Sequence, residues 1–217
     1  MTEPTFDRRF WEVRWSQVLR DHSDQVARRP PNEWLITEVA NLQPGFALDA
    51  GCGHGSDTLW LAAREWHVTA VDFSATALAH ARSTAETVGP DVAERIDWVE
   101  GDLSTWTPQP AQYDLVLSLY VHADSVDAMV QRLAAGVAPG GTLFMVGHRP
   151  IDPTTGAETA AADQLQVSVD TVTAALDPTR WTFLIAEDRP RPMAGTRSRR
   201  RHLCAAPLLR SHLTISG

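Results

Sequence analysis

The chain has 217 residues, 43% hydrophobic and 21% charged, which is enough for one well-buried core and short for two. Its formal net charge of −8 argues against binding to a nucleic-acid backbone, and all 19 basic residues are arginines, which excludes lysine chemistry. Cys52 and Cys204 are too few for a disulfide framework, so a reducing cytoplasm is expected. The N-terminus has no apolar signal core, and no run reaches membrane-spanning length.

The first part of the chain predicts helices. Residues 6–28, rich in Trp and Arg, predict one helix, and residues 33–41 predict a second, with Asn32 as its cap. From residue 46, short apolar runs alternate with helical patterns. Strands are expected over 46–50, 67–71, 96–100, 113–119 and 142–147, and the intervening helices over 56–65, 74–88 and 125–136. This alternation is typical of βαβ units, with a parallel sheet covered on both faces.

The tail has a different pattern. After a polar stretch over 152–163, interpreted as a surface loop, a helix is predicted over 169–176. Two strands follow, over 181–187 and about 199–205, joined by a loop rather than a helix. The connection without a helix predicts an antiparallel pair that closes the sheet.

The most informative stretch is the loop after the first strand, Asp49-Ala-Gly51-Cys52-Gly53-His54-Gly55. Glycines at alternate positions let the backbone approach a ligand at a helix N-terminus, where free N–H groups favour a carboxylate or phosphate. The acid before them, Asp49, adds a carboxylate that suits a cationic group of the ligand.

Two further acids follow strands. Asp72, 21 residues beyond Gly51, stands where a carboxylate accepts from both ribose hydroxyls; its alternative role is to cap the next helix, for which Ser74 is better placed. Asp102 is suited to an adenine amino group, or it is a turn acid after Gly101. Dinucleotide dehydrogenases share a glycine loop and acid, so an NAD-dependent oxidoreductase is the alternative. The Gly-x-Gly-x-Gly spacing and Asp102 argue against it.

Five motifs in order resemble the class I S-adenosylmethionine-dependent methyltransferases over about residues 45–148. They are Asp49-Ala-Gly-Cys-Gly-His-Gly55, Val68-Thr-Ala-Val-Asp72, Gly101-Asp102, Tyr113-Asp-Leu-Val-Leu-Ser118 and Ala138-Pro-Gly-Gly-Thr-Leu143. The opening Phe10-Trp-Glu-Val-Arg-Trp15 resembles the W-D-x-R-Y helix of a bacterial small-molecule subgroup near the tellurite-resistance and thiopurine methyltransferases.

The resemblance implies an α/β fold: a Rossmann-like, doubly wound, seven-stranded sheet with six parallel strands and one antiparallel, in a three-layer α/β/α sandwich. It implies one domain over 1–217, with a helical lid over 1–45, a cofactor-binding core over 46–150, and a loop, helix and closing strand pair over 151–217. Gly51 and Gly53 would line the methionine part of the cofactor, and Asp49 would hold its amino group. The other implied cofactor residues are Cys52 in the loop, Asp72 at the ribose, Asp102 and Leu103 at the adenine, Phe73 and Leu103 on the adenine faces, and Leu119 near the sulfonium.

Methyl transfer is an in-line displacement, and it needs a base only if the nucleophile starts out protonated. His122 and His148 follow the fourth and fifth strands and are the catalytic candidates, for base chemistry or substrate orientation, with Tyr120 as a third. Trp11, Trp15 and Trp34 either form a lid or pack in the core, and Arg14 is a candidate for a carboxylate or an anionic substrate. No metal-ligand spacing is present, so no metal is expected.

The expected partner is a small-molecule methyl acceptor of unspecified type, with no nucleic acid and no membrane, and the protein is expected to be a monomer or homodimer in the cytoplasm. A second alternative remains open, in which the protein binds S-adenosylmethionine without transferring its methyl group.

Overall fold

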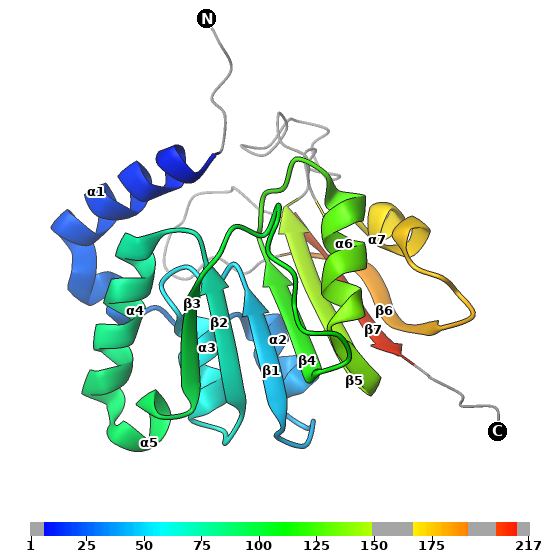
Figure 1. The fold of residues 1–217 in the computed structure, drawn as a ribbon, viewed down its shortest axis with the longest axis horizontal. Helices are drawn as coiled ribbons and strands as arrows, with labels where there is room; N and C mark the ends of the chain where they lie inside the picture. The colour runs from blue at the N-terminus through cyan, green and yellow to red at the C-terminus, as the bar shows by residue number, and fades with distance from the viewer. Residues whose placement is uncertain (1–6, 149–166, 191–202, 212–217) are drawn as a thin grey trace, which may run out of the picture. The chain divides into compact units, whose positions relative to one another are not determined.

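A computed structural model describes residues 7–148, 167–190 and 203–211 (Figure 1). The chain divides into two compact units, Met1–Trp106 and Thr107–Gly217. The predicted surface loop over 152–163, and the part of the last predicted strand before residue 203, lie outside the described residues.

Three parallel strands form the sheet of the first unit. They are β1 (Phe46–Ala50), β2 (His67–Asp72) and β3 (Ile96–Glu100), with β2 in the middle. Ala50 pairs with Val71, and Asp72 pairs with Glu100, so the three strands end at the same edge. Apolar residues such as Leu48, Val68 and Ala70 are buried, as expected for a sheet covered by helices.

The helices of this unit are α1 (Arg8–Ala27), α2 (Glu33–Val39), α3 (Ser56–Ala62), α4 (Ala75–Val88) and α5 (Pro90–Ala93). In contacts between elements, α3 packs on β2, α4 packs on β2 and β3, and α1 packs on α4 (Figure 1). The predicted caps are confirmed: Asn32 Oδ1 accepts from the amides of Trp34 and Leu35, and Ser74 Oγ accepts from the Ala77 amide.

The first unit contains one element that was not predicted, and it decides between the two alternatives that the sequence left open for Trp34. The short helix α5 was not predicted, because Gly89-Pro90 is typical of the end of a helix. Pro90 instead occupies the first turn of a new helix, where its missing N–H is not needed. Trp34 is buried, with 7% of its surface exposed, so it packs in the core rather than over a ligand.

The second unit contains β4 (Tyr113–Leu119), β5 (Val137–His148), β6 (Trp181–Pro190) and β7 (Leu203–Ser211), with α6 (Val126–Ala135) and α7 (Val169–Ala175). β4 and β5 are parallel, while β7 lies between β5 and β6 and is antiparallel to both. The predicted antiparallel pair is therefore confirmed.

The boundaries of three strands in this unit differ from the prediction. β6 extends to Pro190 instead of residue 187. β7 extends to Ser211, whereas the predicted strand ends near residue 205. Pro207 lies within the ladder between β6 and β7, opposite Ala186, although proline usually argues against a paired strand. β5 begins at Val137 instead of Thr142, and the register against β4 shifts across the Pro139-Gly140-Gly141 turn. No helix in the described part of the chain has the length and apolar character needed to cross a bilayer.

Candidate cofactor site

The loop after β1 is fixed to the end of β2. The amides of Gly51 and Cys52 both donate to the carbonyl oxygen of Val71, at 2.8 and 3.0 Å. Gly51, Gly53 and Gly55 have φ angles of 84°, 52° and 80°, in the left-handed region that glycine adopts without strain. The sequence folds this way because glycine adopts three such conformations within five residues without strain, and the result is a tight, largely side-chain-free loop that leads into α3.

Gly55 also has a packing role, which leads to a stability prediction. A Cβ atom at Gly55 would lie 2.9 Å from the Ala81 Cβ and 3.1 Å from the Trp98 ring. We expect Gly55→Ala to destabilise the protein by about 2 kcal/mol, because crowding adds to left-handed strain. Thermal unfolding followed by circular dichroism should show a melting temperature lower by about 4–8 °C. An unchanged melting temperature, equal to that of the exposed control Ala79→Ser on α4, would contradict this.

Asp49 lies at the base of the loop and is almost fully buried. Its Oδ2 accepts a hydrogen bond from Thr58 Oγ1 at 2.6 Å, which connects β1 to α3. Burial raises the pKa of Asp49 to about 7, and the nearby charges of Asp57 and Asp72 add to this effect, while the Thr58 hydrogen bond opposes it. The site therefore holds a carboxyl group that a nearby cation would readily ionise.

Asp72, at the carboxyl end of β2, is oriented by two backbone amides. Gly53 N donates to its Oδ2 at 2.9 Å, and Ser74 N donates to its Oδ1 at 2.8 Å. Burial raises the pKa of Asp72, and these two hydrogen bonds partly offset the rise. Each oxygen accepts one of these hydrogen bonds, so a carboxylate of this kind keeps further acceptor capacity toward a diol.

Asp102 forms the turn that the alternative interpretation expected. Its Oδ1 accepts from Ser104 N at 2.8 Å, and its carbonyl oxygen accepts from the amides of Thr105 and Trp106. The Asp102 side chain is exposed, whereas Leu103 is buried and Phe73 is half-buried. Both the turn role and a ligand role are compatible with an exposed carboxylate in this position.

An aromatic side chain of α1 packs on the glycine loop. A Cβ atom at Gly53 would lie 3.1 Å from Trp15 Cζ2, and the Trp15 and His54 rings lie 5.5 Å apart between centroids. Burial lowers the pKa of His54 to about 4, so its imidazole is neutral. Cys52 is a buried free thiol, and burial raises its pKa. Of the three aromatic residues considered as a lid, Trp15 contacts the loop.

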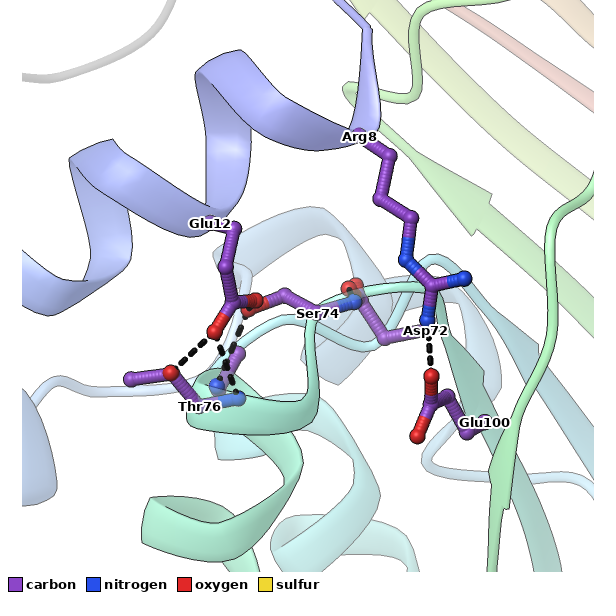
Figure 2. A network of polar contacts seen from close by, with 7 residues as sticks. Arg8, Glu12, Asp72, Ser74, Thr76 and Glu100 are labelled. Carbon is purple, nitrogen blue, oxygen red and sulfur yellow. Dashed lines mark hydrogen bonds and ion pairs between the residues drawn. The ribbon is translucent and has the colours of Figure 1, made fainter.

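The sequence did not single out the polar contacts that α1 makes with the strand ends (Figure 2). Glu12 accepts hydrogen bonds from Ser74 Oγ, at 2.6 Å, and from the amide and hydroxyl of Thr76, and Arg8 pairs with Glu100. Glu12 occupies the acidic position of the W-D-x-R-Y-like pattern, which is the one sequence signal that could have identified it. Arg14 lies near Trp11, with its guanidinium 5.8 Å from the ring centroid.

The second unit carries the remaining predicted residues at the ends of β4 and β5. The Tyr120 and His148 rings are stacked, 4.5 Å apart between centroids and inclined by 24°. Tyr120 has a φ of 59°, which is unusual for a tyrosine, and its amide donates to the Val146 carbonyl at 2.7 Å. Burial lowers the pKa of His122, so its imidazole is neutral at physiological pH. Leu119 ends β4 and is partly exposed.

Residues 47–141 match the family model described as a methyltransferase domain. The match covers less than half of the 217 residues, and solved structures of S-adenosylmethionine-dependent methyltransferases share the α/β fold of the chain.

Among curated relatives, trans-aconitate 2-methyltransferase of Streptomyces avermitilis is 40% identical over 138 residues, covering 59% of this chain and 48% of that protein. The chain thus spans about half the length of the curated relatives that it matches first. TehB from Haemophilus influenzae has a similar structure, with a TM-score of 0.67 and 19% identity, covering 82% of this chain and 62% of that chain. The 1,6-didemethyltoxoflavin-N1-methyltransferase of Burkholderia thailandensis has a TM-score of 0.62 and 20% identity, covering 98% and 93%.

Proposed function

We propose that this protein is an S-adenosylmethionine-dependent methyltransferase that acts on a small molecule. The observation that carries the proposal is the paired geometry of Asp72 and the glycine loop. The Gly53 amide donates to the Asp72 carboxylate, so an adenosyl-binding acid and a carboxylate-binding loop are fixed relative to each other. The match over residues 47–141 supports the same conclusion.

The residues of the site fit this cofactor. Left-handed glycines, which carry no side chain, let the methionine part of the cofactor approach the backbone closely, and Asp49 suits its ammonium group. Asp72 suits the ribose diol, and Asp102, with Leu103 and Phe73 as apolar neighbours, suits the adenine. The proposed cofactor set is therefore Asp49, Gly51, Cys52, Gly53, Asp72, Phe73, Asp102, Leu103 and Leu119.

When bound, the sulfonium of the cofactor supplies an activated methyl group. The chain's own contribution is to orient the donor and the acceptor and to exclude water. We assign acceptor chemistry to His148, the last residue of β5, and to His122, which follows β4. His122 is in its neutral, basic form, and the Tyr120 stack fixes the His148 ring. A protonated nucleophile would require one of them as a base, whereas an ionised one requires only orientation.

The acceptor is proposed to be small. Several curated relatives are named for trans-aconitate, so an organic acid is the first acceptor to test. A carboxylate is already ionised at neutral pH, and for such an acceptor the histidines would orient the substrate instead of deprotonating it. No nucleic acid partner is proposed, because the net charge is −8.

The finer architecture is also a proposal. The family fold and the strand order support one seven-stranded sheet with six parallel strands and β7 antiparallel. We propose a single domain over 1–217, with 1–45 as cover, 46–150 as cofactor core and 151–217 as closing segment. We also propose a cytoplasmic location, a monomer or homodimer, and no metal.

Methyl transfer can be tested without knowing the acceptor. The protein is incubated with methyl-tritiated S-adenosylmethionine and either trans-aconitate or a bacterial small-molecule extract, and label is followed into new chromatographic peaks. Enzyme-dependent labelling, lost in Asp72→Ala, is expected. If the cofactor binds but no small molecule gains label, the protein is a cofactor-binding protein that transfers no methyl group.

A further inference from the structure

Helix α1 reaches the carboxyl ends of all three strands of its unit with one face. Arg8, Glu12 and Trp15 are spaced i, i+4 and i+7, which places them on the same side of the helix. Trp15 packs on Gly53 after β1, Glu12 contacts the segment after β2, and Arg8 pairs with Glu100 at the end of β3. These are the three strand ends to which the proposed function assigns the methionine, ribose and adenine parts of the cofactor.

Glu12 makes the densest of these contacts (Figure 2). Its Oε2 accepts from Ser74 Oγ at 2.6 Å, and its Oε1 accepts from Thr76 N at 3.3 Å and from the Thr76 hydroxyl. Although burial opposes ionisation, the hydrogen bonds from Ser74 and Thr76 and the charge of Arg8 lower the pKa of Glu12 overall. Glu12 is therefore a carboxylate at neutral pH, and its contacts are charge-assisted.

These contacts lie at the N-terminus of α4, where a negative charge is stabilising. The fourteen residues of α4, all described, include no acid in the first turn, so Glu12 provides that charge from another helix. Ser74 is fully buried and is shared: its hydroxyl donates to Glu12 and caps α4, while its amide donates to Asp72. Through Ser74, the position of α1 is coupled to the orientation of the proposed ribose acid.

We propose that Glu12 is a positioning residue of the cofactor site, which holds α1 across the strand ends and thereby sets how fast the adenosyl product leaves. The inference rests on the proposed function. Glu12 acts through Ser74 and Thr76 and touches neither reacting atom. In this proposal, release of the product requires α1 to move away from the strand ends, and the Glu12 hydrogen bonds are the most numerous polar contacts that this movement must break.

The test is the dissociation rate of S-adenosylhomocysteine, measured by stopped-flow displacement with tryptophan fluorescence as the signal. We expect Glu12→Ala to release the ligand about tenfold faster, because several charge-assisted hydrogen bonds are lost. Thr76→Val, which keeps the volume of the side chain and removes one donor, should give a smaller increase. In the Glu12→Ala background the effect of Thr76→Val should vanish, because the two residues act through one contact.

Two matched variants serve as controls. Asp24→Ala removes an exposed acid from the same helix and should leave the rate unchanged. Arg8→Gln removes an exposed ion pair, with side chains 53% and 52% exposed, and should change the rate by less than about threefold. Glu12→Gln should restore part of the wild-type rate, because the amide still accepts hydrogen bonds.

The outcomes separate this inference from the proposed function. If the wild-type protein binds S-adenosylhomocysteine, and folded Glu12→Ala and Thr76→Val release it at the wild-type rate, the role of Glu12 is overturned. The proposed function then stays intact. Additive effects of the two substitutions also count against it. Failure of the wild-type protein to bind S-adenosylhomocysteine overturns the proposed function itself, and this inference with it.

Discussion

Asp72→Ala is expected to weaken the binding of S-adenosylmethionine by about 100-fold, because two charge-assisted hydrogen bonds to the ribose are lost. The carboxylate is already oriented by the amides of Gly53 and Ser74, so the wild-type protein spends little free energy arranging it on binding. Equilibrium dialysis with labelled cofactor measures the change directly. Asp72→Asn keeps the side-chain volume and one hydrogen-bond acceptor, so its affinity for the cofactor should lie between those of the wild type and Asp72→Ala.

The substitution also removes the acceptor of two backbone amides, so the melting temperature of each Asp72 variant must be measured beside its affinity. Asp97→Ala is the matched control, since Asp97 is an exposed acid on the adjacent strand β3. A folded Asp72→Ala protein that binds the cofactor within about threefold of wild type would exclude a ribose role for this residue.

The affinity for S-adenosylmethionine should rise with pH, which is the second large effect. Burial raises the pKa of Asp49 to about 7, so the carboxyl is largely protonated at pH 6 and ionised at pH 8. The cofactor ammonium favours the ionised form, and one proton is released on binding below the pKa. The dissociation constant should therefore be about tenfold larger at pH 6 than at pH 8. Equilibrium dialysis between pH 6 and pH 8 measures this dissociation constant. Asp49→Asn, whose affinity should not change with pH, is the comparison.

Asp49 also affects stability in the ligand-free protein. The folded-state pKa of about 7 lies above the ordinary value of 3.8, so the folded state binds more protons than the unfolded state between these values. The contribution of this group to stability is therefore lost as the pH rises from about 4 to 7. Asp49→Asn should unfold at a higher denaturant concentration than wild type at pH 8. An equal or lower midpoint would contradict the raised pKa.

Much of the fold was predictable because apolar runs and caps are local signals. The boundaries of β1, β3 and β4 match the predicted strands, and Ser74 caps α4 as expected. The departures arise where local rules are overridden by neighbours. Pro207 pairs with Ala186 of β6, whereas the pairs of β7 with β5 pass from Leu208 to Ala205 without it, so its missing N–H falls at a gap in that ladder. Neither partner strand can be recognised from the residues around the proline.

The site was partly predictable for the same reason. Parallel strands end at one edge, so Asp49, Asp72 and the glycine loop were expected together, and the Gly53–Asp72 hydrogen bond joins two of these features. The roles of the cofactor residues and of His148 and His122 stay predictions. Glu12 was not identified, because its partners Ser74 and Thr76 lie 62 and 64 positions away. Such contacts depend on how α1 packs, which no local pattern specifies.

A calorimetric titration of the wild-type protein with S-adenosylmethionine tests the central claim most directly. The account predicts a one-site isotherm with a dissociation constant on the order of micromolar, and a comparable isotherm with S-adenosylhomocysteine. NADH should give no saturable heat. Absence of heat with both sulfur compounds, or saturable NADH binding that Asp72→Ala abolishes, would contradict the assignment of the glycine loop and Asp72 to a methyl donor.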